Sequence, residues 1–287
     1  MKLSVNPVLE KEAKIKMRSW RAPALLSVYL LFLSGLVILY FVSRNLDGYY
    51  SNFDPRTALN IYTMLSFFQL GLLIFIIPGL TSAAISGERE RQTLDLLLCT
   101  RLSSWSVVIG KLTASLSHVM LLIAASIPVF SIVFLYGGIS PLDVISVFLF
   151  QIVTAFLVGS IGIFFSSLFK RTAVATIVTY TVLLMLVVGT IAGYVFYAVT
   201  RHRLLGWYPS FWESLSILSV NPFIGLGALL EKQTGHFGFV SEMLRRHSTN
   251  VPHYIEDLPW MINIGFNIVL SVVLLLLSAW LIKPGRR

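Results

Sequence analysis

Six long apolar segments dominate this sequence and leave little of the chain free to fold in water. A helix needs roughly 20 mostly apolar residues to cross the hydrocarbon core of a bilayer, and it must satisfy its own backbone hydrogen bonds there. Pro78 and Pro128 fall inside two of the segments and are expected to kink or end those helices. The segments run over residues 23–42, 59–84, 107–136, 143–169, 173–200 and 260–282. The sequence therefore predicts an all-α integral membrane protein with about six transmembrane helices.

The composition favours a single membrane domain over separate soluble domains. Of the 287 residues, 56% are hydrophobic and only 12% are charged, whereas soluble domains are about 25% charged. We therefore expect residues 1–287 to form one transmembrane domain. The single cysteine excludes an intrachain disulfide.

The distribution of positive charge predicts the orientation of the chain. With a cytoplasmic N-terminus, 15 of the 22 Lys and Arg residues fall in cytoplasmic segments, as the positive-inside rule requires. Both termini are then expected to be cytoplasmic. The basic residues are spread over separate loops without an aromatic-interleaved patch, so nucleic acid is not an expected partner.

Residues 6–21 are predicted to form an amphipathic helix on the membrane surface. Asn6 is a suitable N-cap and Pro7 suits the first helical position. An apolar stripe at helical spacing would face the lipids, with basic residues near anionic headgroups. The alternative is a charged tail that only fixes the topology. The stripe consists of Leu9, Ala13, Met17 and Trp20.

A second cytoplasmic feature, residues 86–104, separates the second and third spans. A charged turn from Glu88 to Arg91 is followed directly by a leucine-rich run over residues 94–98. Glu88 is expected to meet Arg91 or Gln92 on one helix face. A short helix of this kind is suited to docking in a groove of a partner protein. The alternative is a solvated connector whose leucines begin the next span.

Residues 201–259 form the one long external segment. It begins with an aromatic cluster that includes Trp207, Tyr208 and Trp212, and such clusters lie at membrane interfaces. We expect short interfacial or partly re-entrant helices here and no independent domain.

The sequence contains no recognisable catalytic or cofactor-binding constellation. It lacks a phosphate-binding loop of the form G-x-x-x-x-G-K-[ST], a metalloprotease motif and a nucleophile elbow, and its five histidines lack metal-ligand spacing. We therefore expect a chain that is not an enzyme and holds no cofactor or metal. Any energy for uphill transport would have to come from a partner.

The interiors of the spans carry almost no charge, which argues against an ion relay. Lys111 and Asp143 lie near span ends, where their side chains are expected to reach the interface. Asn263 and Asn267 are four residues apart and share a helix face. We expect them to form interhelical hydrogen bonds, although a face on a substrate path is an alternative.

Four motifs in order along the chain give it a resemblance to a known family. An N-P-V-L-x-K-E start spans residues 6–12, and a G-E-R-E-x-x-T-L-D-L-L-L motif spans residues 87–98. A G-K-L at residues 110–112 opens the third span, and an N-P-F at residues 221–223 precedes the last span. In this order the motifs resemble the permease subunits of ABC-2 type ABC transporters.

The resemblance implies an exporter subunit in a bacterial plasma membrane. It implies a second permease subunit, identical or not, and cytoplasmic ATPase subunits that bind ATP and Mg. Residues 87–98 would be the coupling helix in a groove of the ATPase, and the N-terminal helix would be a second contact. The family often has Gly where this chain has Gln92, and Thr-Pro-Leu-Ser where it has residues 100–103. The implied ATPase contacts are Glu88, Arg89, Glu90, Arg91, Thr93, Leu94 and Asp95.

Two other functions stay open. A membrane assembly or anchoring subunit that transports nothing would share the docking features. A membrane-embedded enzyme acting on lipid would need polar residues that converge at one membrane depth, which the sequence does not indicate. The substrate is not predicted.

Overall fold

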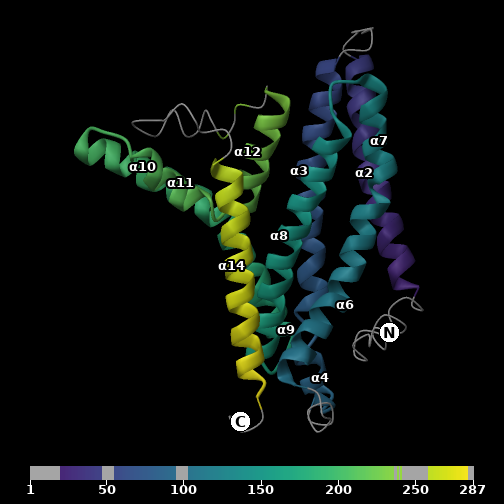
Figure 1. Cartoon of the computed structure of the whole chain (residues 1–287), viewed down its shortest axis with the longest axis vertical. Helices are drawn as coiled ribbons and strands as arrows, with labels where there is room; N and C mark the ends of the chain where they lie inside the picture. Colours follow the sequence, from purple (N-terminus) through teal and green to yellow (C-terminus); the bar gives the residue numbers. More distant parts are fainter. Residues whose placement is uncertain are drawn as a thin grey trace, which may run out of the picture.

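The computed structural model describes residues 20–46, 55–94, 103–235, 238, 240 and 258–283. Within these residues the secondary-structure elements are all helices (Figure 1). They are α2 (Arg21–Leu46), α3 (Pro55–Thr81), α4 (Ser86–Glu90), α6 (Ser104–Ala125), α7 (Ile127–Tyr136), α8 (Pro141–Leu168), α9 (Thr172–Leu184), the π-helix η1 (Met185–Gly189), α10 (Thr190–Leu205), α11 (Phe211–Leu218), α12 (Pro222–Thr234) and α14 (Leu258–Leu281).

Six helical stretches of the described chain are long and apolar enough to cross a membrane, which confirms the predicted all-α membrane fold. A seventh crossing exists only if α11 and α12, which meet at 116°, are counted together as one bent span. The six stretches are Pro23–Ser43, Thr57–Glu90, Ser104–Val133, Pro141–Leu168, Thr172–Leu205 and Pro259–Leu281.

Helix α8 lies at the centre of the bundle and packs against α3, α6, α9, α12 and α14. It approaches α3 closely at Gly162, where an added Cβ would lie only 2.0 Å from Oγ1 of Thr81. Successive spans alternate in direction, so α6 and α9 begin where α3, α8 and α14 end (Figure 1). We call this end of the bundle, where α4 lies, the α4 end.

The second and third spans are interrupted near their prolines. Pro78 lies within the last turn of α3, which ends three residues later at Thr81. The third span breaks at Ser126, between α6 and α7, and Pro128 is the second residue of α7. The helices therefore end close to the prolines, as predicted.

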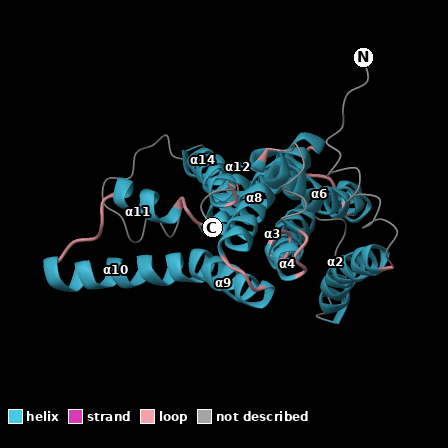
Figure 2. Ribbon diagram, turned by 90° about the horizontal axis from the view of Figure 1, so that it is seen from below, coloured by secondary structure: helices cyan, strands magenta, loops and turns pink. Residues whose placement is uncertain are grey.

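The fifth span leaves the bundle along its length. It runs through α9, the π-helix η1 and α10, and Figure 2 shows α10 lying beside α11 and away from the other helices. Within residues 201–259, α11 and α12 form a bent pair, and whether these helices are interfacial or re-entrant stays a prediction. The residues of that segment at 236–237, 239 and 241–257 lie outside the described chain.

A buried asparagine cluster holds this bent pair to its neighbours. Asn221 Nδ2 donates a hydrogen bond to the Val187 carbonyl oxygen of η1 at 2.6 Å. Asn263 Nδ2 donates to the Ser219 carbonyl oxygen at 2.6 Å, and Asn267 Nδ2 donates to Asn263 Oδ1 at 2.9 Å. Both asparagines of α14 are fully buried. The predicted interhelical hydrogen bonding is thus confirmed for Asn263, whose partner is a backbone carbonyl freed where helices break. The bond from Asn267 Nδ2 stays within α14.

Candidate functional site

The charged segment after the second span lies against the ends of three other spans. After α3 ends at Thr81, a turn over residues 82–85 leads into α4 at the α4 end of the bundle (Figure 1). Residues 95–102 lie outside the described chain. Each of the first three charged residues of the segment reaches a different helix.

The start of α4 is capped by another helix. Its N-cap residue is Ile85, whose side chain cannot accept a hydrogen bond, although the first amides of a helix need acceptors. Ser166 Oγ of α8 accepts from the amides of Ile85 and Ser86, at 2.9 and 3.0 Å. This contact fixes the start of α4 on the end of α8.

Glu88 forms an ion pair with Lys111 of α6. Lys111 Nζ lies 2.7 Å from Glu88 Oε1, and the two side chains are 3% and 25% exposed. The Lys111 side chain is buried against α4, and its expected position at the membrane interface stays a prediction. The expected pairing of Glu88 with Arg91 or Gln92 is replaced by this contact, since α4 ends at Glu90, before those positions.

Arg89 binds the carbonyl end of α8. Its guanidinium nitrogens Nη2 and Nη1 donate to the carbonyl oxygens of Ser167 at 3.1 Å and Phe169 at 3.4 Å. These carbonyls are at the C-terminus of α8, where no further helical turn supplies donors. A cation at this position also interacts favourably with the helix dipole.

Glu90 binds the amide end of α9. Its Oε1 accepts from the amide of Thr172 at 2.9 Å, and its Oε2 accepts from Thr172 Oγ1 at 2.6 Å. The N-cap residue of α9, Arg171, makes no side-chain cap of its own. A carboxylate at a helix N-terminus satisfies an orphan amide and complements the dipole.

The next residues turn outward. Arg91, Gln92 and Thr93 are exposed, and Leu94 is buried in the apolar cluster below them. Gln92 has φ of 57°, a left-handed conformation that glycine adopts without strain. The family's frequent Gly at this position therefore suits the turn, and Gln92 makes the same turn at a steric cost.

Some predicted site residues can be placed and others cannot. Trp20 is 84% exposed, while Leu9, Ala13, Met17 and Asp95 lie outside the described chain. Whether these residues or the charged segment contact a partner stays a prediction. Sequence reasoning missed Lys111, Ser166 and Thr172 as partners of the segment. The one available signal was a lysine inside an apolar span, which requires a counter-charge when buried.

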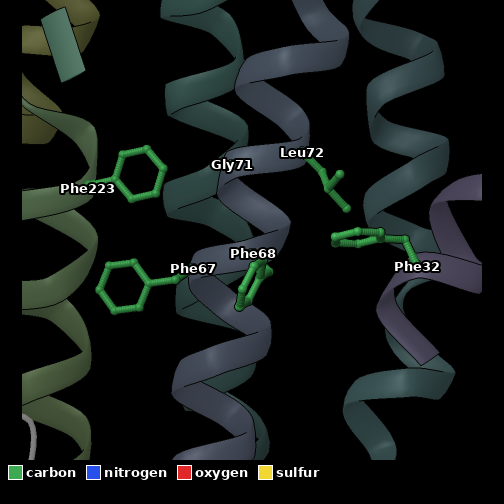
Figure 3. Close-up of a pocket in the computed structure, with 6 residues that line it drawn as sticks. All are labelled: Phe32, Phe67, Phe68, Gly71, Leu72 and Phe223. Carbon is green, nitrogen blue, oxygen red and sulfur yellow. The ribbon is translucent and has the colours of Figure 1, made fainter. Parts of the chain in front are cut away.

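A separate apolar hollow of about 360 Å³ lies between α2, α3 and α12 (Figure 3). The rings of Phe67 and Phe223 are parallel with centroids 6.2 Å apart on one side of it. On the other side Phe32 faces Phe68, with centroids 6.3 Å apart. The hollow is lined by Phe32, Phe67, Phe68, Gly71, Leu72 and Phe223.

Among the described residues, no group of three His, Cys, Asp or Glu side chains could hold a metal ion.

Comparison with known proteins agrees with the motifs. Residues 6–281 match the family described as ABC-2 family transporter protein. No curated protein matches the chain significantly. The match covers all six candidate spans and the charged segment on α4. The chain therefore belongs to the ABC-2 transporter family and is a membrane permease of an ABC transporter.

Proposed function

We propose that this permease is the membrane subunit of an ATP-driven exporter in a bacterial plasma membrane. Separate cytoplasmic subunits bind ATP and Mg and dock at the α4 end, and a second permease subunit completes the pathway. Both termini are then cytoplasmic, with residues 6–21 on the inner membrane surface. The distribution of Lys and Arg supports this orientation.

The observation that carries the proposal is the exposed turn formed by Arg91, Gln92 and Thr93. It directly follows α4, which is fixed to α6, α8 and α9. A partner that binds this turn is therefore connected to three further spans through contacts on the same segment. ATP binding can change the membrane domain only if the partner interacts differently with two of its conformations, and this turn is the place for such contacts.

Co-purification tests the docking. The tagged chain is expressed together with ABC-type ATP-binding subunits from the same genome and purified in mild detergent. We expect a complex that hydrolyses ATP, with recovery of the ATPase reduced by Arg91→Glu. Lys170→Glu is the matched control, because Lys170 is exposed at the same end and undergoes the same change of charge. If no ATP-binding subunit accompanies the wild-type chain, the proposed coupling is wrong.

Transport direction is tested in inside-out membrane vesicles. The vesicles are incubated with a cell extract, and mass spectrometry identifies compounds that accumulate only with ATP. An exporter accumulates its cargo in these vesicles, and a partner with an inactivated ATP site abolishes the accumulation. Accumulation only in right-side-out vesicles would identify an importer, and none in either would favour an assembly subunit.

A further inference from the structure

We infer that Glu88, Arg89 and Glu90 act as a latch within the permease, which transmits movement of α4 to α6, α8 and α9. The inference rests on the proposed docking of ATPase subunits beside α4. It gives these three residues a positioning role between helices. It also adds Lys111, Ser166 and Thr172, which no family motif assigns to coupling, as the membrane-domain half of the latch.

The latch uses two kinds of partner for its charged side chains: a buried ion of opposite charge and the polar ends of helices. Lys111 is 3% exposed and finds its counter-charge in Glu88 at 2.7 Å. Arg89 and Glu90 bind helix termini of matching polarity, a carbonyl end for the cation and an amide end for the anion. Inverting the sign of each of these three charges would place each residue against a terminus or ion of its own sign.

Each link joins elements that are far apart in the sequence but adjacent at the α4 end. Glu88 and Lys111 are 23 residues apart, Arg89 and Ser167 are 78 apart, and Glu90 and Thr172 are 82 apart. Because α8 ends and α9 begins within four residues, Arg89 and Glu90 hold both sides of one tight connection. A displacement of α4 therefore either moves these three helices with it or breaks the bonds.

The contacts leave α4 with little freedom to move alone. Ser166 holds the start of α4 through two backbone amides. Just before α4, Ser82 Oγ shares a hydrogen bond of 2.8 Å with Thr176 Oγ1 of α9. The buried bonds, those of Ser166 to the start of α4 and of Glu88 to Lys111, have few alternative partners nearby, since the remaining helix interior satisfies its own hydrogen bonds. Glu90 is exposed, and its carboxylate can also bond to water. The buried bonds make the segment a rigid attachment between the exposed turn and the spans.

The test measures conformation directly, because the cargo is unidentified. The complete transporter in lipid nanodiscs carries spin labels at Leu142→Cys and Leu204→Cys, in a background without the native cysteine. Both leucines are exposed, at 73% and 77%, in the first turn of α8 and the last turn of α10. Labelled chains are diluted with unlabelled ones, and the distance between the labels is measured by pulsed electron spin resonance with and without ATP and vanadate.

We expect the wild type to change its distance distribution when ATP and vanadate bind. Thr172→Val removes the hydroxyl donor to Glu90 and keeps the amide donor and a similar shape, so this variant is expected to reduce the change. Thr172→Ser keeps both donors and is expected to retain the full change. Lys111→Met removes the ion pair with Glu88 and should reduce the change as well. In all three variants the ATPase subunit should still co-purify in wild-type amounts.

The outcomes separate the latch from the docking proposal. If the wild type does not bind an ATP-binding subunit, the proposed function itself fails. If the wild type responds and Thr172→Val and Lys111→Met respond equally, the latch is refuted while the docking stands. If these variants lose the ATPase subunit, the residues act in docking, which also overturns the latch. Should Lys111→Met fail to fold, the Thr172→Val and Thr172→Ser pair decides alone.

Discussion

We expect removal of the charge on Glu88 and removal of the charge on Lys111 to destabilise the protein by different amounts. The Lys111 side chain is 3% exposed and that of Glu88 is 25% exposed. Glu88→Gln leaves a buried ammonium with a neutral partner, and an uncompensated buried charge costs about 3–5 kcal/mol. The amide oxygen of Gln can still accept a hydrogen bond, so we expect a loss near the lower figure, about 3 kcal/mol.

Lys111→Met should cost less, because the Glu88 side chain is 25% exposed while that of Lys111 is 3% exposed. Methionine fills a similar apolar volume along α6, and Glu88, whose Oε2 is already buried without a hydrogen-bond partner, can change its side-chain conformation toward water. We expect a loss of about 1 kcal/mol, similar to a partly exposed ion pair. The double variant Glu88→Gln/Lys111→Met has no unpaired charge, and neutral replacement of a buried pair is often close to neutral in stability. Its loss should therefore be about 1 kcal/mol, well below the sum of the two single losses.

Reversible unfolding in mixed micelles measures these differences. The purified chain is titrated with sodium dodecyl sulfate in a mild detergent, and unfolding is followed by the fluorescence of its six tryptophans. Lys170→Met removes an exposed lysine at the same end and should change stability by less than about 0.5 kcal/mol. The reasoning is refuted if Glu88→Gln is no more destabilising than Lys111→Met, or if the two losses simply add in the double variant.

Three further predictions use the same unfolding assay. Gln92→Gly should raise stability by up to about 1 kcal/mol, because glycine adopts the left-handed backbone conformation at φ of 57° without strain. Gln92→Val should lower stability. Equal effects of the two substitutions would argue against backbone strain at this position. Asn221→Ala leaves the Val187 carbonyl without its donor, so a loss of about 1–3 kcal/mol is expected. Gly162→Ala should lose more than about 2 kcal/mol, because its Cβ would overlap Thr81; a stable variant would show that α3 and α8 can separate without loss.

The spans and the fold class could be predicted because the bilayer imposes one requirement on each segment separately. Any stretch such as residues 143–169 that is long and apolar must be a helix if it lies in lipid. Breaks within a span were only partly predictable. Pro128 marked the break near Ser126, but nothing in the sequence of η1 indicated that its carbonyls would be supplied with a donor from Asn221.

The partners of the charged residues were not predictable from local spacing. Helical periodicity placed Glu88 and Arg91 on the same helix face. However, α4 ends at Glu90, and Glu88 bonds to Lys111 instead. That choice depends on where α6 begins relative to α4, which is a property of the packed bundle. Thr172 gave no signal of its own, because its role depends on the missing cap of α9 and on Glu90 lying beside its amide and hydroxyl in the packed bundle.

The chemistry at the α4 end has a simple physical origin. In the unbroken part of a span the backbone groups are bonded inside their own helix, so a charged side chain there finds few partners and faces apolar surroundings. At helix ends the first amides and last carbonyls are unsatisfied, and Arg89 and Glu90 bind these groups on α8 and α9. Charged residues such as Arg89 and Glu90 can therefore link helices through backbone groups where the helices end together. A segment that carries such residues on its inner side and an exposed turn on its outer side is well placed to pass force between a partner in water and helices in lipid.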